Sequence, residues 1–152
     1  MNDEWGTPQK LFDKLDKQFN FVLDAAASYE NHKVSFYYTK ESNSLDKEWT
    51  LDGWIWCNPP YSRNLIIKFA DKFLIEAKKG ARIVALVRLD PGANWFKTLM
   101  NSGYTDVYFL DKRLKFEGAA SSYPFPCCLL VISPLIADDP LHKTVEYCGV
   151  PK

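Results

Sequence analysis

The stretch WIWCNPPYS, residues 54–62, joins an apolar run to a stiff polar exit. Its first four residues, WIWC, predict a buried strand. Pro59 and Pro60 cannot continue that strand, because proline lacks a backbone N–H and fixes φ, so the strand should end at Asn58. In open α/β sheets, ligands bind beside the carboxyl ends of the strands. The stretch therefore predicts the edge of a sheet and the place where chemistry should be sought.

Strand and helix patterns alternate along the chain from about residue 20, which favours an α/β sheet. The run ARIVALV, residues 81–87, is β-branched and apolar almost throughout, as expected of a central parallel strand covered on both faces. The series from Leu65 to Ala77 has helical spacing and ends before Gly80, a favoured residue just past a helix. In chain order we expect a helix over 7–19, strands over 19–24, 34–39 and 53–57, a helix over 64–79, a strand over 81–87, a helix over 93–102 and a strand over 125–133.

Local patterns sharpen these expectations at the N-terminal end. Thr7 is a suitable N-cap for the first helix, and Pro8 suits its first helical position. Asp24 should end the first strand and lead into a turn of small residues at 25–28. The Asp24 carboxyl and Asn58 would then share the carboxyl edge of the sheet.

The C-terminal third of the chain is rich in strand patterns. Segments 106–110 and 113–118, separated by two polar residues, predict an antiparallel pair or a bend. Residues 40–49 predict a loop or a short helical turn. The tail from Pro134 is expected to be loosely ordered.

Bulk composition bounds the class of protein. A chain of 152 residues is the size of one ordinary domain, so a single domain over residues 1–152 is expected. Its apolar runs are too short to span a bilayer and no leader pattern opens it, which predicts a cytoplasmic protein without a membrane partner. The four cysteines show no CxxC spacing, so buried free thiols are expected rather than a metal site. With 19 basic and 19 acidic residues, net charge neither indicates nor excludes a nucleic-acid partner.

The residues NPPY, 58–61, have the chemistry of a clamp for a planar amine. The lone pair of an exocyclic amine is delocalised into its ring, and acceptors that bind the amine protons free it for attack. Asn58 offers a side-chain carbonyl, and Pro59 offers a backbone carbonyl that Pro60 helps to orient. Tyr61 offers a flat face on which a base taken out of its duplex would stack. The plain alternative is a proline-rich turn after a strand.

At these residues the chain resembles a known family. NPPY after an apolar strand matches the (D/N/S)PP(Y/F/W) motif of S-adenosylmethionine-dependent amino-methyltransferases, and the chain is similar to phage and prophage DNA N6-adenine methyltransferases of the Dam type. The similarity runs from WGTPQKLFDKLDKQFNFVLDAAAS through SLDKEW and WCNPPYS to ALV and RLKFEG…PFP, roughly residues 5–133. It implies a Rossmann-like class I methyltransferase fold, α/β with a mostly parallel sheet, an antiparallel C-terminal strand pair and helices on both faces. It also implies S-adenosylmethionine as cofactor, no metal, adenine N6 in DNA as substrate, and a phage or prophage origin in a bacterial host.

The resemblance assigns roles to individual residues. Asp24 would bind the methionine ammonium of the cofactor, and the small Ala25 and Ala26 would let the backbone approach it closely, in place of the glycine-rich loop common among methyltransferases. Asn43 stands where the family often has an acidic residue near the cofactor's adenine, and Glu41 is a candidate for the ribose hydroxyls or a solvated loop residue. The implied sets are catalytic residues Asn58, Pro59, Pro60 and Tyr61, and cofactor-binding residues Thr7, Pro8, Asp24, Ala25, Ala26, Asn43 and Asn58.

Three basic residues are candidates for binding DNA. Arg63 follows the NPPY motif directly, and Arg113 and Lys115 belong to the group DKRLKF. Arginine suits phosphate oxygens, although a solvated basic edge explains Lys115 equally well. The small polar segment 117–126 is either a loop that orders on DNA or a plain connection. The oligomeric state, monomer or homodimer, and the target sequence are left open.

Two other readings stay open. NPPY also occurs in methyltransferases that act on a glutamine side chain of a protein or on guanine in ribosomal RNA, whose target nitrogens are planar as well. A nucleic-acid-binding relative that has lost catalysis is the third, because the cofactor loop is alanine-rich and Asn43 replaces an acidic residue. A Ser/His/Asp hydrolase lacks the nucleophile elbow that it needs.

Overall fold

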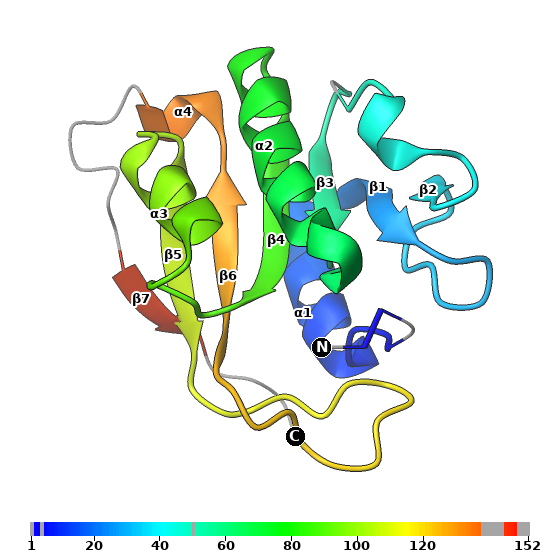
Figure 1. The fold of residues 1–152 in the computed structure, drawn as a ribbon. Helices are drawn as coiled ribbons and strands as arrows, with labels where there is room; N and C mark the ends of the chain where they lie inside the picture. The colour runs from blue at the N-terminus through cyan, green and yellow to red at the C-terminus, as the bar shows by residue number, and fades with distance from the viewer. Residues whose placement is uncertain (1, 4, 50, 138–144, 149–152) are drawn as a thin grey trace.

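A computed structural model of the chain describes residues 2–3, 5–49, 51–137 and 145–148. Seven strands form one sheet in the order β2-β1-β3-β4-β6-β5-β7 (Figure 1). Strand β6 runs antiparallel to its neighbours β4 and β5, and the other four pairings are parallel. The strands are β1 (Phe21–Ala27), β2 (Tyr37–Thr39), β3 (Trp54–Cys57), β4 (Arg82–Arg88), β5 (Thr105–Leu110), β6 (Cys127–Ile132) and β7 (Val145–Cys148).

Helices cover both faces of the sheet, α1 (Gln9–Phe19) on one and α2 (Leu65–Lys78) with α3 (Asn94–Asn101) on the other (Figure 1). Strand β4 shows why both faces are covered. Val84 and Leu86 pack into the cluster beneath α1, whereas Ile83, Ala85 and Val87 pack beneath α2 and α3. A strand that is apolar on both faces needs cover on both sides. The predicted fold class, a Rossmann-like α/β sheet that is mostly parallel, is confirmed.

The predicted antiparallel C-terminal strand pair is confirmed and consists of β5 and β6, and the chain between segments 106–110 and 113–118 bends rather than forming a hairpin. Residues 113–118 do not form a strand but run through a loop, where Gly6 and Glu117 form a single antiparallel bridge. The antiparallel strand is β6, which lies between β4 and β5 because its fully apolar residues fill the centre of the sheet. The tail, expected to be loosely ordered, contains α4 (Pro134–Ala137) and the backbone of β7, which pairs with β5; its residues 138–144 and 149–152 lie outside the described part.

Two predictions about the N-terminal region were also wrong. Pro8, with φ −55° and ψ 129°, is extended and occupies the N-cap, so α1 starts at Gln9 and the Thr7 side chain caps nothing. Strand β1 does not end at Asp24 but continues to Ala27, because its pairing with β2 resumes after an irregularity between these two residues. Asp24 therefore lies within a strand, whereas Asn58 follows β3 directly, as predicted. Strand β2 is shorter than the predicted 34–39.

Candidate active site

A cavity of about 400 Å³ lies where β1 and β3 run side by side. The chain passes from β1 outward to β2 on one side, and from β3 outward to β4 on the other. The place between β1 and β3 is therefore the switch point of the sheet, where open α/β folds usually bind their ligands. The size is within the range of small-molecule sites. Its lining combines the N-terminal segment, β1 with the loop after it, the short helix η1 (Ser44–Asp46) and the NPPY loop.

Asn58 is fixed by a residue from the far end of the sequence. Its Nδ2 donates to Thr7 Oγ1 at 3.1 Å, across 51 positions of sequence. Thr7 is buried at 2% exposure, so this bond is shielded from water. Because the amide nitrogen is occupied by Thr7, the Asn58 carbonyl oxygen remains the acceptor that this side chain can offer to a ligand.

The rest of the NPPY loop is held by packing and by one backbone bond. Pro59 is buried and Pro60 half-buried, and both line the cavity. The Tyr61 hydroxyl accepts a bond of 2.8 Å from the Arg88 N–H, and its ring meets Trp95 edge-on at 6.2 Å. Burial raises the pKa of Tyr61 well above its usual range, so the hydroxyl stays neutral. The tyrosine ring is thus held rigidly at the cavity wall.

Asp3 is a site residue that the sequence analysis missed. Its carboxylate accepts hydrogen bonds from the Tyr61 N–H at 3.0 Å, from the Ser62 N–H at 3.4 Å and from the Ser62 hydroxyl. It also lines the cavity. An aspartate near the N-terminus carries no local signal for such a contact, because the partner lies 58 positions away.

Asp24 is a carboxylate buried in the cavity wall at 3% exposure. Its two oxygens accept backbone N–H bonds, one from Lys33 at 2.9 Å and one from Ala26 at 3.3 Å. Among the described residues it has no ion-pair partner. Burial raises the pKa of Asp24 to about 6, and the bonds from Lys33 and Ala26 only partly oppose this rise. A cation in the cavity would remove the penalty.

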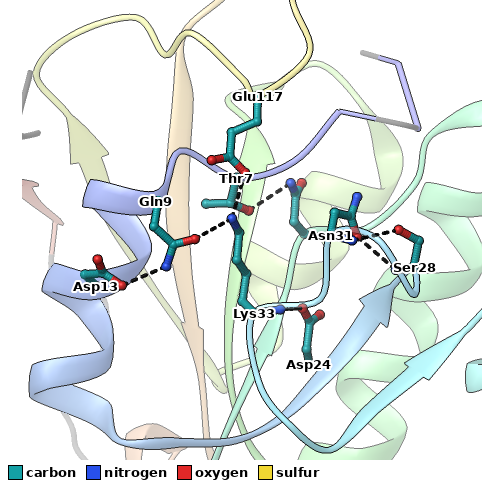
Figure 2. Close-up of polar contacts among 9 residues, drawn as sticks. Thr7, Gln9, Asp13, Asp24, Ser28, Asn31, Lys33 and Glu117 are labelled. Carbon is teal, nitrogen blue, oxygen red and sulfur yellow. Dashed lines mark hydrogen bonds and ion pairs between the residues drawn. The ribbon is translucent and has the colours of Figure 1, made fainter.

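The Lys33 ammonium does not pair with the Asp24 carboxylate, as Figure 2 shows. It reaches away from Asp24 and donates to Gln9 Oε1 and Glu117 Oε1, both at 2.7 Å. The Lys33 side chain is only 7% exposed. Its hydrogen bonds link the loop after β1 to α1 and to the loop after β5. Before it, Ser28 and Asn31 exchange reciprocal side-chain to backbone bonds that shape the turn (Figure 2). This loop, missed by the sequence analysis, presents its own N–H to Asp24.

The other predicted cofactor residues surround the same cavity, apart from Pro8. Ala25 and Ala26 line it from β1, and Asn43 and Glu41 line it from the segment after β2. Asn43 has a left-handed backbone with φ 56°, and its side chain donates to Asp46. Ser44, also missed, is buried and donates to the Ala25 carbonyl at 2.5 Å, which holds η1 against β1. Pro8 is not among the lining residues.

The three predicted DNA-binding residues lie outside the cavity. Arg63 is exposed with a left-handed backbone (φ 53°) in η2 (Ser62–Asn64), directly after the NPPY loop. Arg113 and Lys115 are exposed on the loop between β5 and β6. That loop runs past the carboxyl edge of the parallel strands (Figure 1). The basic residues therefore flank the site without entering it.

The described residues, 2–3, 5–49, 51–137 and 145–148, also bear on metal binding, on the cysteines and on membrane spans. Within these ranges no three His, Cys, Asp or Glu side chains gather as metal ligands. Cys57, Cys127 and Cys128 are buried free thiols, as predicted, and the side chain of Cys148 lies outside the described part. In the same described part, no helix has the length and apolarity needed to cross a membrane.

Comparison with known proteins agrees with this geometry. A family model described as DNA N-6-adenine-methyltransferase (Dam) matches residues 1–135. A DNA N-6-adenine-methyltransferase of Escherichia phage T1 is 34% identical over 97 residues, which cover 63% of this chain and 40% of that protein. YfdM of Escherichia coli (strain K12), named as a candidate methyltransferase, is 37% identical over 67 residues, covering 40% of this chain and 74% of its own. The match thus spans about two fifths of the phage T1 protein.

The sheet order, with the NPPY loop at its carboxyl edge, is that of the Rossmann-like class I methyltransferase fold. Within that class, the chain belongs to the DNA N-6-adenine-methyltransferase (Dam) family.

Proposed function

We propose that this protein transfers a methyl group from S-adenosylmethionine to the exocyclic N6 amine of adenine in DNA, with the target base flipped into the NPPY pocket. One observation carries the proposal. A single cavity brings together Asn58, whose NH₂ group donates to Thr7, and Asp24, a buried carboxylate that forms no ion pair among the described residues. The first suits an amine substrate and the second suits the cationic end of the cofactor.

The residues around Asp24 fit S-adenosylmethionine. A carboxylate whose pKa burial raises to about 6 gains most from a nearby ammonium group, such as that of the cofactor's methionine. Ala25 and Ala26 add little bulk to the cavity wall, and Glu41, which lines the cavity after β2, would accept hydrogen bonds from the ribose hydroxyls. When bound, the cofactor supplies a methyl group on a charged sulfonium, which needs no further activation.

The NPPY loop would bind and orient the adenine amine. The Asn58 side-chain carbonyl and the Pro59 backbone carbonyl would accept hydrogen bonds from the two N–H groups of the amine, which draws the nitrogen toward tetrahedral geometry. Tyr61 stacks on the base with a ring already fixed by Arg88 and Trp95, so little side-chain freedom is lost on binding. Reaction then depends on alignment of the amine with the methyl group and on exclusion of water.

DNA would approach across the carboxyl edge of the sheet. Arg63 next to the NPPY loop, and Arg113 and Lys115 on the loop after β5, are exposed there and suit phosphate oxygens. The target sequence is found by sequencing DNA from cells that express the protein, with detection of modified adenines.

The test of this function is transfer of a radioactive methyl group from S-adenosylmethionine to DNA, with RNA and protein offered in parallel. We expect label in DNA as N6-methyladenine, and a loss of at least about a hundredfold in Asn58→Ala while cofactor affinity largely survives. Asn101→Ala, on the exposed end of α3, is the matched control and should retain full activity. Label only in protein or only in RNA would overturn the substrate assignment. Full activity of Asn58→Ala would overturn the mechanism.

A further inference from the structure

The exit of the NPPY loop offers few groups by which the fold can hold it. Pro59 and Pro60 have no backbone N–H, so the first amides available after Asn58 are those of Tyr61 and Ser62. Directly after them, Arg63 and Asn64 both have left-handed backbones, with φ 53° and 60°. Two successive non-glycine residues in that region cost energy and persist only where neighbouring contacts fix the chain.

The Asp3 carboxylate supplies those contacts. Both free amides of the exit donate to Asp3 Oδ1, from Tyr61 at 3.0 Å and from Ser62 at 3.4 Å, and the Ser62 hydroxyl donates to Oδ2. At the entrance of the same loop, Asn58 donates to Thr7. The N-terminal segment therefore holds the NPPY loop at both ends, through Thr7 at its entrance and Asp3 at its exit.

We propose that Asp3 is a positioning residue for methyl transfer, which sets the direction of the Tyr61 ring and the Pro59 carbonyl by binding the backbone of the loop's exit. The proposal rests on the proposed function. Three hydrogen bonds converge on this one carboxylate from a loop that otherwise lacks amide donors. Burial raises the pKa of Asp3, but the bonds from Ser62 and Tyr61 outweigh it and hold the pKa below its ordinary value, so the acceptor stays charged at neutral pH.

Asp3 also stands apart from the core that stabilises the fold. It is an exposed residue by its overall accessibility, and neither hydrophobic cluster includes it. Its removal opens no cavity in the core, so the effect should fall on the loop and on catalysis rather than on folding.

The experiment compares Asp3→Ala and Asp3→Asn with wild type and with Asp52→Ala, a control at a fully exposed aspartate on another loop. We expect Asp3→Ala to lower kcat at least about tenfold, with the KM for DNA and for cofactor within about twofold. Asp3→Asn should recover most of kcat, because its carbonyl accepts both amides and its NH₂ donates to the Ser62 hydroxyl. Hydrogen exchange of the Tyr61 and Ser62 amides should become at least about tenfold faster in Asp3→Ala and stay unchanged in Asp52→Ala.

Unchanged kcat in Asp3→Ala would overturn the proposal. So would a rise in KM at constant kcat, since that result means direct contact with a ligand, and so would unchanged exchange of the two amides. If wild type transfers no methyl group to DNA, the proposed function fails, and the exchange measurement still decides whether Asp3 holds the loop.

Discussion

Asp24 and Glu76 are both buried carboxylates, and their surroundings are opposite. Glu76 of α2, at 0% exposure, accepts the Trp49 N–H at 2.6 Å and pairs with Lys79 at 3.0 Å and Lys72 at 3.6 Å. Asp24 of β1, at 3% exposure, has two backbone N–H bonds and no cation. Burial raises the pKa of both carboxyls, but at Glu76 the bonds from Trp49 and Lys79 and the charge of Lys72 prevail and lower it.

The difference separates a carboxylate balanced within the protein from one that we propose to bind the cofactor. Glu76 ties α2 to the segment before β3 and has its countercharges within the protein. Asp24 faces a cavity and forms no ion pair among the described residues, so its ionisation costs free energy that a cation bound in the cavity would offset. Burial alone therefore does not mark a functional carboxylate. Burial in a cavity wall without an ion pair among the described residues makes Asp24 a candidate for binding a cationic ligand.

The largest effect should come from Asp24→Asn, which removes the charge but keeps the size of the side chain. We expect the affinity for S-adenosylmethionine to fall at least about a hundredfold, since the ammonium loses its countercharge. Isothermal titration calorimetry measures this directly. Asp52→Asn, at a fully exposed aspartate that does not line the cavity, serves as the matched control and should leave the affinity within about threefold.

The same variant should gain stability in the absence of cofactor. The folded pKa of Asp24, about 6, lies above its ordinary value of 3.8. Its contribution to stability is therefore fully present below pH 3.8 and is lost as the pH rises through 6. The loss amounts to about 3 kcal/mol at pH 7, and Asp24→Asn should recover part of it. A variant that is less stable than wild type at pH 7, with unchanged cofactor affinity, would make Asp24 a structural residue like Glu76.

Glu76→Ala should behave in the opposite way. It leaves the buried Trp49 N–H without an acceptor and Lys72, whose side chain is 11% exposed, without its countercharge. We expect the free energy of unfolding to fall by about 2 to 3 kcal/mol, measured by urea denaturation, with cofactor affinity of the folded protein unchanged. Glu76→Gln keeps an acceptor and should lose less. Impaired cofactor binding in a folded Glu76→Gln would break the contrast with Asp24.

The order of strands and helices could be predicted because apolar periodicity is local and strong. ARIVALV became β4, and the predicted 64–79 helix became α2 with Gly80 just after it, at φ 111°. The errors arose where distant contacts decide. The small residues 25–27 have weak strand propensity, yet pairing with β2 extends β1 to Ala27. Residues 113–118 alternate like a strand but find only one bridge, to Gly6.

The candidate site was predictable to the extent that it follows a motif. NPPY and the family resemblance led to Asn58, Tyr61 and Asp24, and all three line one cavity. Thr7 looked like a helix cap because capping is judged from neighbours, whereas its partner is Asn58 in another element. Asp3 had no signal for the same reason: its contacts join segments far apart in sequence, and spacing along the chain does not encode them.

A smaller effect is expected from pH. Because Asp24 must be ionised to bind an ammonium group, cofactor affinity should weaken as the pH falls below about 6, by at most about tenfold per unit. Titration calorimetry between pH 5 and 7.5, over the range in which the protein stays folded, measures the slope. Asp24→Asn is the control and should show no such slope. A wild-type affinity that is constant across this range would mean that Asp24 does not meet the cationic end of the cofactor.

The smallest effect separates the two lysines that pair with Glu76. Lys72 is 11% exposed and also donates to the Lys47 carbonyl at 2.7 Å, whereas Lys79 is 47% exposed and lies at the helix end. Lys72→Met should lower the free energy of unfolding by about 1 kcal/mol, because the pair is largely shielded from water and the Lys47 bond is lost. Lys79→Met, the matched control, should leave stability unchanged within error in urea denaturation. Equal losses in both variants would mean that the charge on Glu76 is balanced mainly through solvent-exposed contacts. The comparison with Asp24 would then rest on the Trp49 bond alone.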